Sequence, residues 1–383
     1  MTTLTVNSKT FNSTTDPLLP TPALAKPISK RIARIDTYLN ALFQAGEFSG
    51  SVAIACDKAD IITRSYGLSN REHEVLNTPQ TRFRIGSLTK QFTAVSILQL
   101  QEKGLLNVHS PISNYLPSYP RCENITVHHL LSHTSGIPEY LDPGAFSDFF
   151  EWMQLPTTLG HLVDRFKDLP LEFVPGEKFK YGNSGYALLA QIIESLTQQP
   201  YADYLQVNVL DPLALRNTGQ EIPLAVITHL AQGYVPIQGD VYLQASPFDL
   251  SIAQGAGGLY STVADLVKWN QWLCGKDADR RVLGQAARAM MLTPVVQIDI
   301  AETPDAFYCY GVALDTYLER SRIHHLGGIS GFASALAYYP KEKLTIAVLS
   351  NFEAATVQSI GEELATIMFE PFPTTQPDVS KNN

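Results

Sequence analysis

The tetrapeptide Ser87-Leu88-Thr89-Lys90 combines a nucleophile and a base at a spacing that suits covalent catalysis. It is the only Ser-x-x-Lys in the chain, and it opens a stretch, 87–106, whose pattern predicts a helix. Residues three apart on a helix lie one above the other, so the Lys90 amine would lie beside the Ser87 hydroxyl. A serine hydroxyl needs such a base at neutral pH, and a buried lysine can lose its charge and accept the proton. The start of the helix adds backbone N–H groups where an oxyanion would form.

A second candidate group is Tyr181-Gly182-Asn183, in a glycine-punctuated segment before an expected helix at 186–196. A tyrosine hydroxyl can relay a proton if a neighbouring cation lowers its pKa from about 10. The asparagine amide can hold the lysine or a substrate amide through its donor and acceptor ends. The same Tyr-x-Asn pattern occurs at Tyr38-Leu39-Asn40, but inside an amphipathic helix, where Tyr38 is expected to pack.

A third candidate group is His325-Leu326-Gly327-Gly328, on an expected late strand. Glycines on a strand allow a substrate to approach the backbone closely, and the Gly328 N–H could pair with the Ser87 N–H as an oxyanion hole. His324 must point to the opposite face of such a strand, so only one of the two histidines faces the cleft. We expect it to be His325, which directly precedes Leu-Gly-Gly.

Together, Ser-x-x-Lys, Tyr-x-Asn and a basic residue followed by glycines resemble the serine β-lactamase and penicillin-binding-protein superfamily. The surrounding segments are similar to class C β-lactamase-related hydrolases, in the esterase and D-aminopeptidase-like branch. They cover roughly residues 34–365, in the order found in that family, and read FRIGSLTKQFTA, LLSHTSGIPEY, PGEKFKYGNSGYALLAQIIE, GAGGLYSTVADLVKW, HHLGGISGF and LTIAVLSN.

The resemblance implies a β-lactamase-like (DD-peptidase) fold of the α+β class and assigns roles to the candidate residues. The catalytic residues would be Ser87 as the acylated nucleophile, Lys90 as its base and Tyr181 as a second proton carrier. Substrate-binding and oxyanion roles would fall to Asn183, His325, Gly327 and Gly328. One departure stands out: His325 and Leu326 occupy positions where the family carries Lys-Thr to hold a substrate carboxylate. We therefore expect esters, amides or D-amino-acid peptides rather than penicillins as substrates.

The pattern of elements along the chain predicts one sheet built from both termini. Apolar residues at helical spacing predict a helix at 28–45, and further helices are expected at 262–273 and 356–368. Strands are expected at 51–55, 61–66, 310–317, 333–339 and 344–349, with helices and loops between 106 and 306. This predicts an antiparallel sheet flanked by helices, with a mostly helical insertion.

The expected organisation is a single catalytic unit, 28–370, between two disordered segments, 1–27 and 371–383. Its α/β part would comprise 28–86 and 307–370, and its helical part 87–306. The disordered assignments rest on polar, Pro-, Ser- and Thr-rich composition.

Composition narrows the class of protein. With 45% hydrophobic and 17% charged residues, a net charge of -9 and 383 residues, the chain is typical of a globular enzyme and not of a protein that binds nucleic acid. No apolar run approaches the roughly 20 residues of a membrane span, and the N-terminus lacks a signal-peptide pattern, so a cytoplasmic location is expected. The four cysteines are expected to be reduced.

Neither a metal nor a cofactor is expected. His129 and His133 are four apart, but no His-Glu-x-x-His pattern accompanies them, and structural roles are expected for both. No Gly-x-Ser-x-Gly occurs, which disfavours an α/β-hydrolase.

The sequence therefore predicts a serine hydrolase that acts through an acyl-enzyme on a small-molecule or peptide substrate. Two alternatives stay open. One is an acyltransferase, in which an alcohol or amine replaces water. The other is a non-catalytic penicillin-binding sensor or structural relative. The oligomeric state is left open by the sequence.

Overall fold

The structure, a computed structural model, describes residues 25–57, 61–144, 146–222, 224–238, 241–275, 280–298 and 305–370. Its centre is an eight-stranded sheet in the order β10-β11-β12-β13-β14-β15-β1-β2, in which all neighbours are antiparallel. The strands are β1 (Gly50–Cys56), β2 (Ile62–Tyr66), β10 (Val296–Gln297), β11 (Phe307–Tyr308), β12 (Ala313–Tyr317), β13 (Arg320–Ile329), β14 (Phe332–Tyr339) and β15 (Leu344–Ser350). Because β1 lies between β15 and β2, the prediction of a sheet built from both termini is confirmed.

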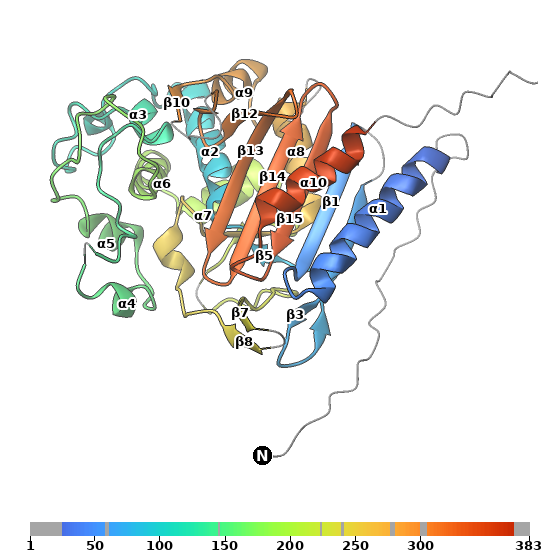
Figure 1. The fold of residues 1–383 in the computed structure, drawn as a ribbon. Helices are drawn as coiled ribbons and strands as arrows, with labels where there is room; N and C mark the ends of the chain where they lie inside the picture. The colour runs from blue at the N-terminus through green and yellow to red at the C-terminus, as the bar shows by residue number, and fades with distance from the viewer. Residues whose placement is uncertain are drawn as a thin grey trace, which may run out of the picture.

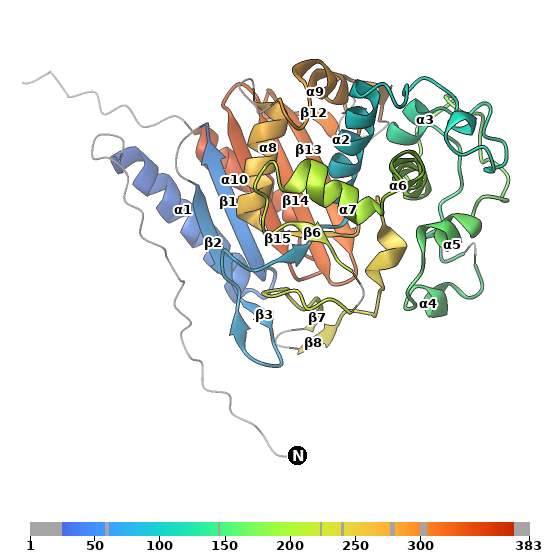
Figure 2. The same cartoon turned by 180° about the vertical axis from the view of Figure 1, so that it is seen from behind.

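Helices cover both faces of this sheet. On one face lie α1 (Ala25–Gln44) and α10 (Val357–Phe369), as Figure 1 shows. On the other lie α2 (Thr89–Glu102) and α8 (Val263–Cys274), visible in Figure 2. The side chains of β15 alternate accordingly: Ile346 and Val348 belong to the core beneath α1 and α10, whereas Ala347 and Leu349 belong to the larger core on the other face. A strand with two buried faces is apolar throughout, which is why LTIAVLS could be predicted as a strand.

The helical part lies beside the sheet, beyond β12 and β13 (Figure 1). It contains α3 (Val127–Leu131), α4 (Phe149–Trp152), α5 (Leu159–Asp164), α6 (Ser184–Thr197) and α7 (Tyr201–Leu205), and α9 (Gln285–Met291) packs against α2. The fold is α+β, as predicted.

The expectation that 106–306 contains only helices and loops is wrong. Short strands occur there: β6 (Gly219–Gln220), β7 (Tyr234–Gln238), β8 (Val241–Gln244), β9 (Leu259–Ser261) and β10. They form a small sheet, β5-β9-β6, with β5 at Phe83–Arg84, and a hairpin, β7-β8; a further hairpin pairs β3 (Leu68–Asn70) with β4 (Val75–Leu76). Strands of two to five residues are too short to show an alternating pattern in the sequence.

Two expected elements have different bounds. The stretch predicted as one helix, 87–106, is a 3₁₀ turn, Gly86–Leu88, followed by α2, which ends before Gly104 at a φ of 72°. The strand predicted at 310–317 begins only at Ala313, because Gly311, at a φ of 77°, turns the chain. The disordered segments were predicted for 1–27 and 371–383; residues 1–24 and 371–383 lie outside the described residues, and α1 already begins at Ala25. No helix within the described ranges is long and apolar enough to cross a membrane.

Candidate active site

Ser87 lies in a 3₁₀ turn that packs against the open edge of β13. The pairing of β12 with β13 ends at His324, so the edge of β13 beyond that residue has no neighbouring strand. Gly86 fills this place with a φ of 49°, and a Cβ on it would lie 2.8 Å from the backbone nitrogen of Gly328. A side chain on Gly86 would separate turn and strand, so this glycine brings Ser87 beside the Gly328 backbone.

Gly327 and Gly328 differ in what surrounds them. A Cβ on Gly327 would lie 2.1 Å from the Ile85 carbonyl oxygen and 2.3 Å from Ser334 Oγ, so this glycine permits tight packing under the turn. A Cβ on Gly328 would meet nothing within 4 Å, and Gly328 lines the same cleft as Ser87. Of the two glycines, Gly328 is therefore the one exposed toward a substrate.

Lys90 is fully buried, and its amine has three oxygen neighbours. Nζ lies 3.1 Å from Ser87 Oγ, 2.8 Å from Asn183 Oδ1 and 3.0 Å from the Ala256 carbonyl oxygen. The amide and carbonyl oxygens can only accept hydrogen bonds. A neutral amine can therefore donate its two protons to Asn183 and Ala256 and point its lone pair at the Ser87 hydroxyl.

The electrostatics of Lys90 favour that neutral amine. Desolvation by burial lowers the pKa of Lys90 from 10.5 to about 7, because the charged form loses its hydration. The negative charge of Glu139 opposes this and raises the pKa. The amine is thus balanced near neutrality, where it can both take and return a proton.

Glu139 also orients Asn183, the residue before α6. Its carboxylate accepts hydrogen bonds from the Asn183 backbone N–H and from Asn183 Nδ2, the latter at 3.4 Å, and from the Leu141 N–H at 2.8 Å. Holding Nδ2 on the carboxylate leaves Asn183 Oδ1 facing Lys90. Ser184 adds a second link between the segment that carries Glu139 and the start of α6, because its Oγ donates to the Pro138 carbonyl at 2.6 Å.

Tyr181 covers the buried amine. Lys90 Nζ lies 4.8 Å from the centre of the Tyr181 ring, and the tyrosine hydroxyl forms a hydrogen bond with Ser87. Although 39% of the residue is exposed, its hydroxyl end is desolvated, and burial raises the pKa of Tyr181 well above 10. The condition that a neighbouring cation lowers this pKa is not met, because desolvation outweighs the hydrogen bond with Ser87 and the negative charge of Glu139 raises the pKa further. Tyr181 is a neutral phenol that can pass a proton on.

A buried chain of hydrogen bonds connects the Tyr181 loop to β13. The Gly182 N–H donates to His133 Nδ1 at 3.3 Å, and His133 Nε2 lies 3.1 Å from the Tyr308 hydroxyl. That hydroxyl lies 3.1 Å from His325 Nε2, while His325 Nδ1 lies 2.6 Å from the Leu326 carbonyl oxygen. The two ends fix the tautomers: His133 donates through Nε2, Tyr308 donates to His325 Nε2, and His325 donates through Nδ1.

His325 is consequently a neutral member of this chain. Burial, together with the charge of the nearby Lys90, lowers its pKa from 6.5 to about 3. As expected, His324 faces the other side of the sheet, where Nε2 lies 3.2 Å from Asp315 Oδ2. Leu326 also lies on that side and lines a small hollow against α10 with Gly361 and Glu362. Its side chain therefore does not occupy the position of a substrate-binding hydroxyl in the cleft.

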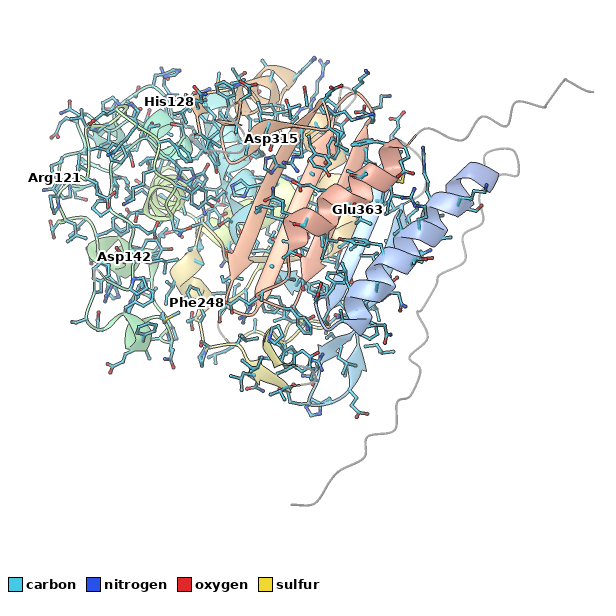
Figure 3. The ribbon with its side chains drawn as sticks, viewed as in Figure 1. Arg121, His128, Asp142, Phe248, Asp315 and Glu363 are labelled. Carbon is cyan, nitrogen blue, oxygen red and sulfur yellow. The ribbon has the colours of Figure 1, made fainter. Side chains whose placement is uncertain are left out.

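An open cleft of about 890 Å³ leads to Ser87. Aromatic and aliphatic side chains line part of it, namely Tyr140, Leu141, Phe150, Met153 and Phe248, of which Phe248 is labelled in Figure 3. The rest of the lining consists of Ser87, Asn183, Ser246, Ala253, Gly257, Gly328, Ile329, Ser330 and Glu353. Carbonyl compounds with an apolar group fit a cleft of this composition.

Sequence reasoning missed several residues of the site. Glu139 lies in the segment SGIPEY, within one of the stretches that carry the family resemblance, so its position was signalled although its role was not. Ala256 lies in another of these stretches, GAGGLYSTVADLVKW, but the role of its carbonyl was not signalled. Tyr308 and Glu353 had no signal, because each reaches the site only through the fold. Among the described residues, no group of three or more His, Cys, Asp or Glu side chains converges as a metal site would. His128 and His129 bond instead to Tyr310 and to the Thr126 N–H.

The chain matches the family described as Beta-lactamase over residues 35–363. It is 30% identical over 338 residues to penicillin-binding protein 4* of Bacillus subtilis (strain 168). This alignment covers 84% of this chain and 72% of that protein. The solved structure of the penicillin binding protein from Bacillus halodurans is 28% identical, with a TM-score of 0.73 over 85% of this chain and 99% of that one. A D-stereospecific amidohydrolase from Streptomyces sp. is also 28% identical, with a TM-score of 0.73 over 86% and 97%.

These matches confirm the resemblance that the three motifs predicted. They agree with the topology described above, a sheet built from both ends of the chain with a helical part beside it. The chain belongs to the beta-lactamase family, in the superfamily of serine β-lactamases and penicillin-binding proteins.

Proposed function

We propose that this protein is a serine hydrolase that acts through an acyl-enzyme formed on Ser87. The observation that carries the proposal is the placement of Lys90 Nζ, buried and within 3.1 Å of the Ser87 hydroxyl, between two oxygens that can only accept hydrogen bonds. The hydrolase name of the Streptomyces relative supports it.

The chemistry follows from the contacts. Ser87 Oγ forms a bond to the substrate carbonyl carbon while its proton moves to Lys90 Nζ. The negative charge that develops on the carbonyl oxygen is stabilised by the backbone N–H groups of Ser87 and Gly328. As the bond to the leaving group breaks, the leaving group takes a proton from Lys90 through the hydroxyl of Tyr181. Water then attacks the acyl-enzyme and gives its proton to Lys90 through the Tyr181 hydroxyl. The bond to Ser87 Oγ breaks, and Oγ takes a proton back from Lys90.

The charge of the cleft favours substrates without a carboxylate. His325 stands where relatives carry a lysine, but it is neutral and bonded to Tyr308. A substrate carboxylate would lose its hydration without gaining a cation, which is costly, whereas a neutral ester or amide meets no such penalty. Short esters and amides should therefore be hydrolysed with a higher kcat/KM than penicillins.

Intact-mass analysis tests the proposal. The protein is treated with a fluorophosphonate, a series of p-nitrophenyl esters and a penicillin, and adducts are located by peptide mapping. We expect one adduct, on Ser87, with ester turnover, and neither in a folded Ser87→Ala variant. An adduct on Ser246 or Ser330, which line the same cleft, would contradict the assignment.

Turnover separates the two alternatives. Products that form only when an amine or alcohol is added would indicate an acyltransferase. A stable penicillin adduct with no turnover of any ester would indicate a penicillin-binding sensor.

A further inference from the structure

Among the described residues that line the cleft, one side chain carries a formal charge, and it is negative. Glu353 is the only carboxylate in this set, which contains no lysine or arginine. Lys90 lies beneath the floor with no exposed surface, and its amine must be uncharged before it can accept the Ser87 proton. A substrate in this cleft therefore meets a carboxylate and no competing cation.

Glu353 is held in place by its backbone and by one side-chain oxygen. It lies just after β15, where its N–H donates to the Tyr234 carbonyl at 3.1 Å. Its Oε2 accepts a hydrogen bond from the Gly331 N–H, at 3.0 Å, in the turn between β13 and β14. Ser330 fixes the same turn by donating to the Ser246 carbonyl at 2.7 Å. The carboxylate thus has a defined position above the cleft.

The carboxylate of Glu353 can accept further hydrogen bonds and can form an ion pair. Within the described part of the chain, no lysine, arginine or histidine forms an ion pair with Glu353, and Oε1 accepts no hydrogen bond. Glu139, the other carboxylate near the site, accepts three hydrogen bonds from Asn183 and Leu141. Glu353 is therefore the carboxylate that remains available to a ligand.

The cleft also has apolar lining residues, and one of them is largely exposed. Phe150 is 68% exposed, and Phe248, Met153 and Leu141 line the cleft with it. Exposed aromatic and aliphatic side chains beside a nucleophile are suited to an apolar substituent of a substrate.

We propose that Glu353 is a specificity-determining residue that pairs with an ammonium group of the substrate. The preferred substrates are then esters or amides of amino acids with a free amino group and an apolar side chain. This inference rests on the proposed function of Ser87 and narrows its substrate class. It also adds a second reason why penicillins are poor substrates, since their carboxylate would approach a like charge.

The test compares substrates that differ only in the amino group. Phenylalanine methyl ester, in both enantiomers, is compared with methyl 3-phenylpropanoate at pH 7 by chromatography of the acid product. We expect kcat/KM for one enantiomer of the amino ester to exceed that for methyl 3-phenylpropanoate by about threefold, the size of an ion pair with an exposed carboxylate.

Variants assign that preference to Glu353. In Glu353→Gln, which keeps an acceptor for the Gly331 N–H, the ratio of the two kcat/KM values should fall about threefold, mainly through KM of the amino ester. Glu353→Lys should reverse the preference and favour monomethyl phenylsuccinate, which carries a carboxylate. In Glu363→Gln, on α10 at the far face of the sheet (Figure 3), the ratio should stay as in the wild type.

The neutral ester distinguishes the possible failures. If methyl 3-phenylpropanoate and p-nitrophenyl esters acylate Ser87 but the ratio is the same in wild type and Glu353→Gln, the role of Glu353 is overturned while the proposed function stands. If no ester acylates Ser87, the proposed function is overturned and the substrate inference with it.

Discussion

At the scale of single residues, the protonation of Lys90 decides when the site can react. Its amine accepts the Ser87 proton only when neutral, and burial lowers its pKa to about 7. Below that pH the amine is an ammonium with no lone pair, so kcat/KM for a neutral ester should rise with pH through about 7 and then level off.

The two histidines of the site do not interfere with this measurement. Burial holds the pKa of His325 at about 3 and that of His133 well below 6.5, so neither titrates between pH 6 and 8. A pH–rate profile for an uncharged ester therefore reports Lys90. A profile that is flat from pH 5 to 8 would contradict the assignment.

Glu139 sets the position of that inflection. Its negative charge raises the pKa of Lys90, so Glu139→Gln should move the inflection to lower pH. The plateau should also fall, because the carboxylate no longer holds the Asn183 amide. Glu172→Gln, which removes the partner of Lys180 on an exposed loop, is the matched control and should leave the inflection in place.

Tyr181 is expected to act with Lys90 in one proton path. Lys90→Ala and Tyr181→Phe should each lower kcat roughly 10²–10⁴-fold. The double variant should lose little more than the worse single one, because the two residues serve the same transfer. Burst and steady-state rates on several esters measure this, and a Tyr181→Phe rate within about threefold of wild type would exclude a proton-carrying role.

At the scale of elements, Tyr308 on β11 connects the Tyr181 loop to β13 through hydrogen bonds. Its hydroxyl lies between His133 and His325, at 3.1 Å from each. In Tyr308→Phe both imidazoles keep a buried nitrogen without a partner, which should cost about 1–3 kcal/mol of unfolding free energy. Because the Tyr181 loop and β13 are then no longer held by the same hydroxyl, kcat should fall more than KM rises.

Tyr317→Phe is the control for this change. Tyr317 lies on β12 of the same sheet, and its hydroxyl bonds to Thr366 of α10 at 3.1 Å, away from the cleft. It should lose about 0.5–1.5 kcal/mol of stability with unchanged kcat. If Tyr308→Phe behaves in the same way, then Tyr308 contributes only to stability and does not position the site.

At the scale of the whole molecule, Asn351 joins distant parts of the chain. The residue is fully buried after β15; its Oδ1 accepts from Ser49 Oγ at 2.8 Å, and its Nδ2 donates to the carbonyls of Leu68 and Gln232, each at 2.9 Å. One side chain thus satisfies polar groups from the first strands, the insertion and the last strand.

Asn351→Ala should therefore destabilise the fold by about 3–5 kcal/mol, because several buried polar groups lose their partner at once. Asn208→Ala is the control, since the Asn208 side chain donates to the Tyr204 carbonyl one helical turn away and its loss should cost about 1 kcal/mol or less. Urea unfolding measures both. A loss below about 1 kcal/mol for Asn351→Ala would show that the junction adapts without it.

The strands that could be predicted from the sequence are those with two apolar faces or clear alternation, such as β1 and β15. The extent of β13 could not be predicted, because Arg322 and His324 stand in its RSRIHHLGGI sequence. In the structure their charges are paired: Arg322 lies 2.6 Å from Asp315 and 2.8 Å from Glu362. Such pairing across elements makes a polar sequence compatible with a central strand, and no local pattern shows it.

The sequence by itself determined the spacing of Ser87 and Lys90, because three residues of helical backbone are enough to place an amine beside a hydroxyl. It also determined that His324 and His325 face opposite ways, because side chains alternate along any strand. Only the tertiary structure decided the charge of Lys90, since its burial and its partners Asn183 and Ala256 come from segments 93 and 166 residues away. Such burial, and such meeting of distant segments, depend on the whole packed chain. They also made His325 neutral and left Glu353 as the only charged side chain among the described residues that line the cleft.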